Sequence, residues 1–275
     1  MNTAFKRTLL SALVLPCAVA AQSASAAMIT QWAYQVDSSF PSFTQTDGDG
    51  NVVASSPGGV DTLSWGVGTG PQSSVSITDV PETSGLMTNG DAVMGGTFTH
   101  VNNTLPVRGA ALDTFDLRSS LTLTPELPDP GAPEALPPLT FASFFIETLN
   151  STGNCIPESA STCDDIFTIG NIDDLNPVIS GDVYQLASQS FVIDDYSYTV
   201  LLELVGLGPL SDEACAAADA DAGCVGLLTQ EGEFNTFNTR FKITAAEVPE
   251  PGTLALLGMG LAGLGLSRRR KAAKA

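Results

Sequence analysis

The sequence predicts an all-β protein whose main domain, residues 28–247, is an antiparallel β-sandwich of jelly-roll-like topology. Apolar and polar residues alternate along many short segments, as in strands with one buried and one solvent-facing side. Clusters of Gly, Asn, Asp and Pro separate these segments, which is typical of sandwiches. Only residues 214–222 have a helical composition, and no internal repeat divides the chain.

The expected strands can be followed in order along the chain. Alternation is clearest in residues 32–36, 74–78, 118–124 and 235–244. An Asp194-Asp195 pair separates residues 183–193 from residues 196–205, which predicts a long hairpin. Residues 127–138 contain five prolines, too many for a central strand, and we expect a long loop there.

The first 27 residues predict a cleaved secretory signal peptide. Lys6 and Arg7 precede an apolar stretch over residues 9–21, and small residues at 24–27 offer two cleavage frames. Lipidation of Cys17 is an alternative, but Pro16 stands where a lipidation site needs a small residue. We therefore expect a mature chain that begins near residue 27 or 28.

The last 28 residues, 248–275, predict one short transmembrane helix between a rigid break and a basic stop. Residues 253–266 form an apolar run, about 21 Å long as a helix, whereas a hydrocarbon core is about 30 Å thick. The basic residues 268–271 can reach the headgroups beyond the helix and keep the C-terminus in the cytoplasm. The membrane is thus an expected partner of the precursor.

Residues 248–271 resemble the PEP-CTERM sorting signal of Gram-negative bacteria, with Pro249, Glu250 and Pro251 as its naming motif. The resemblance implies export through the secretion translocon and recognition of these three residues by an exosortase-type membrane transpeptidase. It implies an inner-membrane-tethered precursor, and then a place on the outer surface or in the extracellular matrix. A tail that simply stays in place as an anchor is the alternative.

A second motif lies in residues 96–106. Thr99, His100 and Asn102, with Asn103 adjacent, resemble the Thr-His-any-Asn signature of the THxN subset of PEP-CTERM proteins, for which the resemblance implies no activity. We expect a strand that ends in a tight turn, with the imidazole and the amides bound to backbone. His100 is the only histidine, which excludes any site that needs two imidazoles.

Four cysteines follow the signal peptide, and an oxidising compartment favours disulfides between them. Two local pairings, Cys155–Cys163 and Cys215–Cys224, each enclose turn-rich sequence, and we predict both. Zinc is a weak rival, because the cysteine spacings are wide and no histidine is near them.

A weak calcium candidate is the turn that contains Asp47, Asp49 and Asn51, which offer oxygen ligands at alternate positions. An EF-hand loop would continue with a glycine and later a glutamate, but this chain has Val52 and Gly58 at those positions. We therefore predict no firm metal site, and we expect no cofactor.

The net charge of the main domain limits the classes of partner that the protein can bind. Residues 28–247 hold 29 of the 30 acidic residues but only four basic ones, Arg108, Arg118, Arg240 and Lys242. This net charge of about −25 argues against nucleic acid as a partner, because phosphate binding depends on Lys and Arg. It suits an exported protein that stays soluble by self-repulsion.

The sequence thus predicts an exported, exosortase-sorted surface or matrix protein without catalytic activity, associated with exopolysaccharide or biofilm. One alternative is a carbohydrate-binding module that uses Trp32, Trp65 and Tyr184 as exposed aromatic residues. A secreted hydrolase is less favoured, because the chain has no Gly-any-Ser-any-Gly nucleophile motif.

Overall fold

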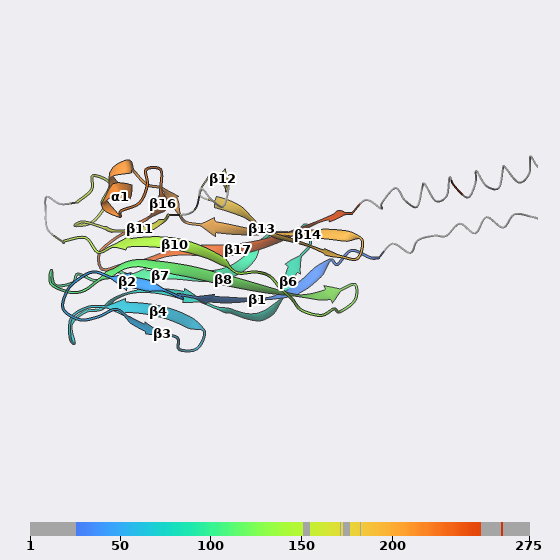
Figure 1. Ribbon diagram of the computed structural model, residues 1–275, viewed down its shortest axis with the longest axis horizontal. Helices are drawn as coiled ribbons and strands as arrows, with labels where there is room; N and C mark the ends of the chain where they lie inside the picture. The colour runs from blue at the N-terminus through green and yellow to red at the C-terminus, as the bar shows by residue number, and fades with distance from the viewer. Residues whose placement is uncertain are drawn as a thin grey trace, which may run out of the picture.

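A computed structural model describes residues 26–150, 155–170, 172, 177–181, 183–248 and 260, which form two antiparallel sheets and one short helix (Figure 1). The predicted all-β, antiparallel class is confirmed. The signal peptide and Pro249, Glu250 and Pro251 lie outside the described residues, as does the predicted membrane helix apart from Gly260. Within the described part, no helix is both long and apolar enough to cross a membrane.

The first sheet contains, in spatial order, β15 (Gly208–Pro209), β16 (Val225–Thr229), β11 (Asp165–Ile169), β10 (Leu139–Ile146), β8 (Leu112–Leu127), β1 (Gln31–Ser39) and β6 (Val80–Met87). Two short strands, β2 (Phe43–Gln45) and β9 (Glu134–Ala135), also pair with β8. The second sheet contains β12 (Val178–Ser180), β13 (Val183–Ile193), β14 (Tyr196–Val205), β17 (Phe234–Glu247), β7 (Val93–Val101), β5 (Ser73–Thr78), β4 (Val60–Trp65) and β3 (Val53–Ser55). The finer jelly-roll assignment stays a prediction.

Two local predictions can be compared with this structure. The predicted hairpin is β13 and β14, joined at Asp194 in a left-handed conformation with φ of 51°. The helix α1 is Asp212–Ala217, earlier and shorter than residues 214–222. It begins there because the Ser211 hydroxyl accepts a hydrogen bond from the Ala214 amide, and it ends before Asp219, whose φ is 55°.

Aromatic rings fill the space between the two sheets. Phe98 of β7 stacks on Phe237 of the neighbouring β17, with ring centroids 4.7 Å apart, and on Phe167 of the opposite sheet, at 4.9 Å. Elsewhere in the core, Trp32 of β1 meets Tyr198 of β14 edge to face, with ring centroids 5.1 Å apart. All of these side chains are buried, so one core joins both sheets.

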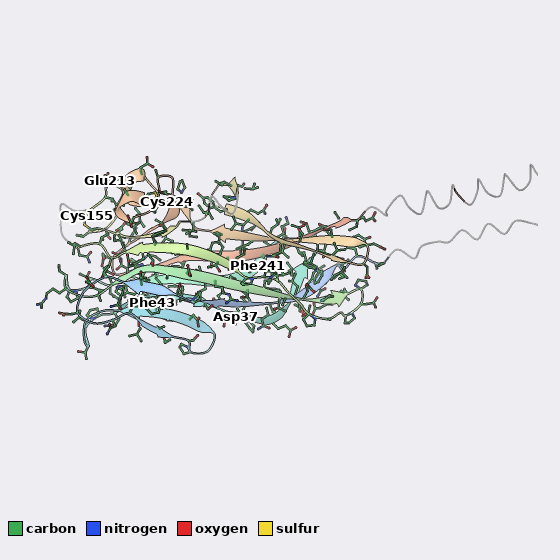
Figure 2. All side chains as sticks on the ribbon, in the orientation of Figure 1. Asp37, Phe43, Cys155, Glu213, Cys224 and Phe241 are labelled. Atoms are coloured by element: carbon green, nitrogen blue, oxygen red, sulfur yellow. A yellow bond between two sulfur atoms is a disulfide. The ribbon has the colours of Figure 1, made fainter. Side chains whose placement is uncertain are left out.

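Both predicted disulfides, Cys155–Cys163 and Cys215–Cys224, are present. The second joins α1 to the start of β16, and Figure 2 shows Cys155 and Cys224 close to this helix at one end of the molecule. The two bridges therefore fasten the segments that cover this end of the sandwich rather than the sheets themselves.

The start and the end of the main domain meet at the opposite end of the sandwich. The Ala26 amide donates to the Asp195 carboxylate and the Val248 amide donates to the Asp195 carbonyl, each at 2.8 Å. Figure 1 shows the blue start and the red end of the ribbon together at the right, whereas α1 lies at the left. The 14 residues of β17 span about 45 Å between these ends.

The aromatic core yields a stability prediction on β17. Phe237→Ala should lower the free energy of unfolding by about 3–5 kcal/mol, because it removes a fully buried ring from the stack. Phe234→Ala, three residues away on a side chain 74% exposed, should change it by less than about 0.5 kcal/mol. Urea unfolding of both variants measures the difference, and equal losses would contradict the described packing.

Candidate functional site

The interior of the sandwich changes from aromatic to polar at the end covered by α1. Residues two apart on a strand point to the same face, so the residue two positions from a core ring also faces the core. On three strands that residue is ionisable. The pairs are Phe98 and His100 on β7, Phe145 and Glu147 at the end of β10, and Phe167 and Asp165 at the start of β11.

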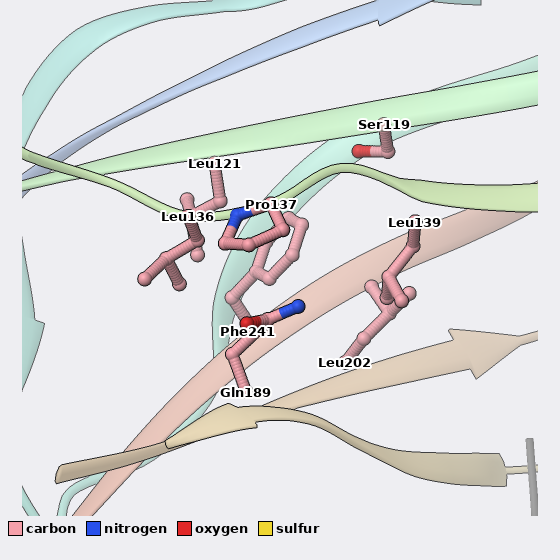
Figure 3. Close-up of a pocket in the computed structure, with 8 residues that line it drawn as sticks. All are labelled: Ser119, Leu121, Leu136, Pro137, Leu139, Gln189, Leu202 and Phe241. Carbon is pink, nitrogen blue, oxygen red and sulfur yellow. The ribbon is translucent and has the colours of Figure 1, made fainter. Parts of the chain in front are cut away.

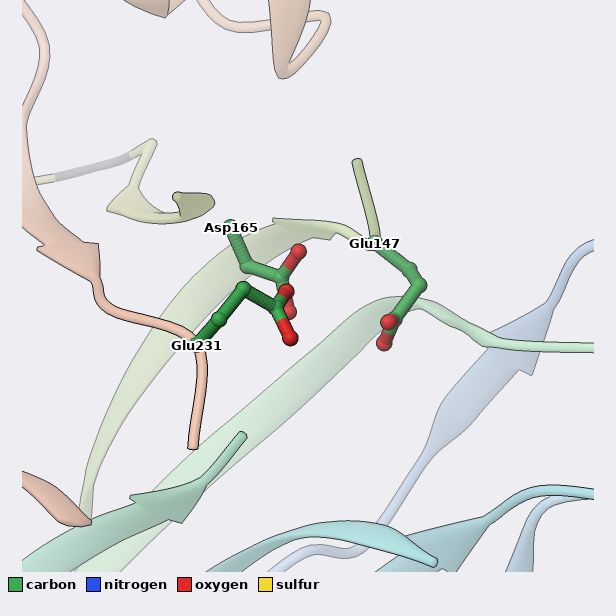
Figure 4. Close-up of side chains that lie close together, drawn as sticks. All are labelled: Glu147, Asp165 and Glu231. Carbon is green, nitrogen blue, oxygen red and sulfur yellow. The ribbon is translucent and has the colours of Figure 1, made fainter. Parts of the chain in front are cut away.

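Three carboxylates converge here, and we call Glu147, Asp165 and Glu231 the acidic cluster. One oxygen from each lies within 4.8 Å of the others, and Figure 4 shows the three side chains pointing toward one another. Glu147 directly follows β10, Asp165 begins the paired strand β11, and Glu231 comes from the loop between β16 and β17. In the described part of the chain, no Lys or Arg forms an ion pair with them.

In each carboxylate of the acidic cluster, one oxygen accepts a hydrogen bond and the other oxygen has no hydrogen-bond partner. Trp65 Nε1 donates to Glu147 Oε2 at 2.8 Å, the Thr148 amide donates to Asp165 Oδ1 at 2.8 Å, and Thr104 Oγ1 donates to Glu231 Oε2 at 3.1 Å. The second oxygens, Glu147 Oε1, Asp165 Oδ2 and Glu231 Oε1, are buried without a hydrogen bond. Such orphaned acceptors are rare in folded proteins and require a physical explanation.

His100 lies against the acidic cluster in an aromatic setting. Its ring stacks on Trp65, with centroids 5.8 Å apart, and meets Phe145 edge to face at 4.9 Å. His100 Nε2 is 3.9 Å from Asp165 Oδ2, too far for a hydrogen bond, and both ring nitrogens are buried without a partner. Burial lowers the pKa of His100 to about 3, so the ring is neutral at pH 7 and forms no ion pair with Asp165.

Burial has the opposite effect on the carboxylates. It raises the pKa of Glu147 to about 7, against the lowering effect of the Trp65 hydrogen bond, and the negative charge of Glu231 adds to the rise. Burial and then the charge of Glu147 also raise the pKa of Asp165 well above its usual value. Carboxylates that lie this close together and are shielded from water cannot all ionise without a compensating positive charge.

The Thr-His-any-Asn residues connect a strand corner to the acidic cluster. Asn102 Nδ2 donates to the Thr229 carbonyl and Asn103 Nδ2 donates to the Gln72 carbonyl, at 2.9 and 2.8 Å, so both amides bind backbone as expected. The imidazole of His100 differs from this expectation, because it binds no backbone group and faces Asp165 instead. Thr99 is half-buried on β7 between Ser76 and Thr236.

A hollow of about 510 Å³ lies beside the acidic cluster. Its lining includes Glu147 itself, Thr148, which binds Asp165, and Thr104, which binds Glu231. By contrast, the hollow in Figure 3 has a volume of about 10 Å³ among apolar side chains such as Leu121, Leu202 and Phe241. The first hollow is large enough for small solutes and meets the cluster at Glu147, whereas the second is no larger than one water.

The other predicted candidates lie elsewhere. Asp47, Asp49 and Asn51 are exposed, and although Asp47 lines the larger hollow, the calcium assignment of this turn stays a prediction. Trp32, Trp65 and Tyr184 are all buried, so they form no solvent-facing row of aromatic residues.

Sequence reasoning missed the acidic cluster, although a signal for it was present. Alternation along residues 141–147 reads Phe141, Ser143, Phe145, Glu147, which places a carboxylate on the core face one step beyond the last ring. The same reading of β11 puts Asp165 beside Phe167. A charged residue in phase with a buried face is the sign that was overlooked.

Comparison with known proteins gives one match. The model of the PEP-CTERM protein-sorting motif matches residues 247–271. This motif implies an exported protein whose membrane-anchored precursor is sorted to the cell surface, with processing by an exosortase-type membrane enzyme. A search of curated proteins found no match.

The corner at the end of β7 yields a testable difference between two neighbouring amides. Asn102→Ala should lower the free energy of unfolding by about 1–3 kcal/mol, because it leaves the buried Thr229 carbonyl without its donor. Asn103→Ala, at a half-buried position, should cost less than about 1 kcal/mol. Chemical denaturation compares the two, and a larger loss in Asn103→Ala would contradict the assignment of Asn102 as the buried anchor.

Proposed function

We propose that this protein is a non-catalytic component of the outer surface or extracellular matrix, released or fixed there after an exosortase-type enzyme recognises Pro249, Glu250 and Pro251. The observation that carries the proposal is the sorting motif at residues 247–271. The proposal also includes three further points: membership of the THxN subset, association with exopolysaccharide or biofilm, and absence of catalysis. The acidic composition of residues 28–247 is compatible with each of them.

The surroundings of His100 support a non-catalytic role. A Ser-His-Asp triad needs a hydrogen bond from the serine hydroxyl to the imidazole. Both nitrogens of His100 are buried without a hydrogen bond, and aromatic rings lie against its plane and its edge. A hydrolase centred on this residue is therefore disfavoured.

A surface role also agrees with the placement of the chain ends. The sorting segment follows Val248, which is fastened to Asp195 at one end of the sandwich. The central strand β17 leads from there to the loop that carries Glu231, at the opposite end. A protein tethered by its tail would thus present the loops around α1 outward, about 45 Å from the point of attachment.

Buried aromatic residues weigh against a carbohydrate-binding module. Flat sugar rings stack on exposed indole or phenol faces, but Trp32, Trp65 and Tyr184 are inside the core. In the part of the chain that the structure describes, Phe234 at the start of β17 is the exposed aromatic side chain, and a single ring offers little area for stacking on a sugar. We do not retain sugar binding through these residues as a second proposal.

The sorting step can be tested by intact-mass measurement of the protein from the native host. We expect material from the culture fluid or outer envelope to lack the first 27 or so residues and everything beyond about residues 249–251. Glu250→Ala should retain the tail and accumulate in the inner membrane. Lys274→Ala, outside the matched segment, should be processed as wild type.

Three outcomes of this measurement are informative. Added mass at the new C-terminus would indicate covalent anchoring. Mature protein that keeps residues 268–275 would show that the tail is only an anchor, and the sorting proposal would fail. Normal surface delivery after deletion of residues 248–275 would overturn it as well.

A further inference from the structure

We propose that the acidic cluster binds one hard divalent cation, Ca²⁺ above all, through carboxylate oxygens of Glu147, Asp165 and Glu231. The three oxygens that lack hydrogen bonds, one on each residue, are the expected ligands. A cation would supply the positive charge that neighbouring side chains in the described part do not. This inference is independent of the sorting proposal, because it concerns the opposite end of the sandwich.

The geometry fits a single ion. Ca²⁺ binds oxygen at about 2.4 Å, so two ligands on opposite sides of one ion lie up to about 4.8 Å apart. One carboxylate oxygen from each residue of the cluster meets that limit. Ca²⁺ also tolerates irregular coordination, whereas Mg²⁺ demands a near-ideal octahedron, and three side chains from two strand ends and a loop form an irregular set.

His100 provides the second, independent observation. It is fully buried, its ring nitrogens are unpartnered, and Nε2 is directed at Asp165 Oδ2 from 3.9 Å. Carboxylates that bind a metal are commonly held by a further hydrogen bond from a neighbouring side chain. A neutral His100 with its proton on Nε2 can provide this bond to Asp165 after a shift of about 1 Å.

The neighbouring hollow supplies access for the ion and its water. It is lined by Glu147 and by the two threonines that hold Asp165 and Glu231 in place. Asn150, whose buried Oδ1 also lacks a partner, lines the same hollow. Ca²⁺ takes six to eight oxygens, so water from this hollow can complete the coordination that the carboxylates begin.

Proton sharing is the competing explanation of the cluster. Protonation of Glu147 and Asp165 would relieve the repulsion within the acidic cluster without any ion, and burial favours the protonated form of these two residues. The two explanations differ in one respect: only cation binding makes the stability of the protein depend on metal concentration.

Calorimetric titration of Ca²⁺ into the EDTA-treated full-length chain tests the proposal. We expect one site per chain and a rise in Tm of about 5–10 °C at a Ca²⁺ concentration a hundredfold above Kd. Asp165→Asn should fold with a metal-free Tm at least as high as that of wild type, because it removes a buried charge, and should lose the Ca²⁺-dependent rise. The double variant Asp47→Asn/Asp49→Asn is the matched control and should keep it.

Several results would overturn the proposal. No heat and no Tm shift with Ca²⁺ would leave proton sharing as the explanation. An equal shift in wild type and Asp165→Asn, or a loss confined to the Asp47→Asn/Asp49→Asn variant, would place the ion elsewhere. Binding of Zn²⁺ without Ca²⁺ would replace a hard-ion site by one that uses the His100 nitrogen. If Asp165→Asn does not fold, Glu231→Gln replaces it, and the same loss of the Ca²⁺-dependent rise in Tm is expected.

Terbium luminescence gives a positional readout. Tb³⁺ takes oxygen ligands as Ca²⁺ does, and its emission is sensitised by an indole close to the ion. Trp65 contacts Glu147, whereas Trp32 packs against Tyr198 toward the other end of the sandwich. Emission that Ca²⁺ displaces, and that is lost in Trp65→Phe but kept in Trp32→Phe, supports a site at the acidic cluster. Emission lost in Trp32→Phe instead would overturn it.

Discussion

The stack of aromatic rings between the two sheets is the constraint on which the arrangement of the candidate site depends. Phe98 contacts Phe237 within its own sheet and Phe167 across the core. Because a slip of one residue would turn every side chain to the opposite face, these contacts fix the register of β7, β11 and β17 together. Two residues further along, His100 and Asp165 are then brought together as well.

The same constraint has an energetic cost at the end of the stack. Where the rings give way to His100, Glu147 and Asp165, the core contains polar atoms without partners, each of which opposes folding. The surrounding segments are correspondingly well fastened. The Cys155–Cys163 bridge immediately precedes Asp165, and the Thr148 hydroxyl donates to the Cys163 carbonyl. Covalent and hydrogen-bonded restraints thus hold a cluster that charge repulsion alone would open.

Sequence reasoning succeeded where structure is set by short-range chemistry. The Asp194-Asp195 turn predicted β13 and β14 to the residue, and the turn-rich sequence enclosed by each cysteine pair predicted both disulfides. The helix was misplaced because Ser211 was not recognised as its N-cap, although Asp212 and Glu213 follow it as first-turn acids.

Local alternation places Glu147 and Asp165 on the core face, but only the fold brings them together with Glu231. Glu147, Asp165 and Glu231 lie far apart in the chain and meet only because β10, β11 and β16 are neighbours in one sheet. His100 approaches from the other sheet, so the strand order of both sheets is needed to pair it with Asp165. The sorting motif is the opposite case, since it is one continuous segment, residues 247–271, and could be found without any knowledge of the fold.

These two features lie at opposite ends of one strand. β17 pairs along its length with β14 and with β7, so it is a central and rigid connection rather than a flexible one. The tail leaves beyond its last residue, and the loop with Glu231 precedes its first. Among the described residues, Trp65, Thr104 and Thr148 bind the acidic cluster, and all three precede β17 in the chain. A cation held there, as we propose, would stabilise a part of the sandwich that precedes the tail, whichever way the tail is processed.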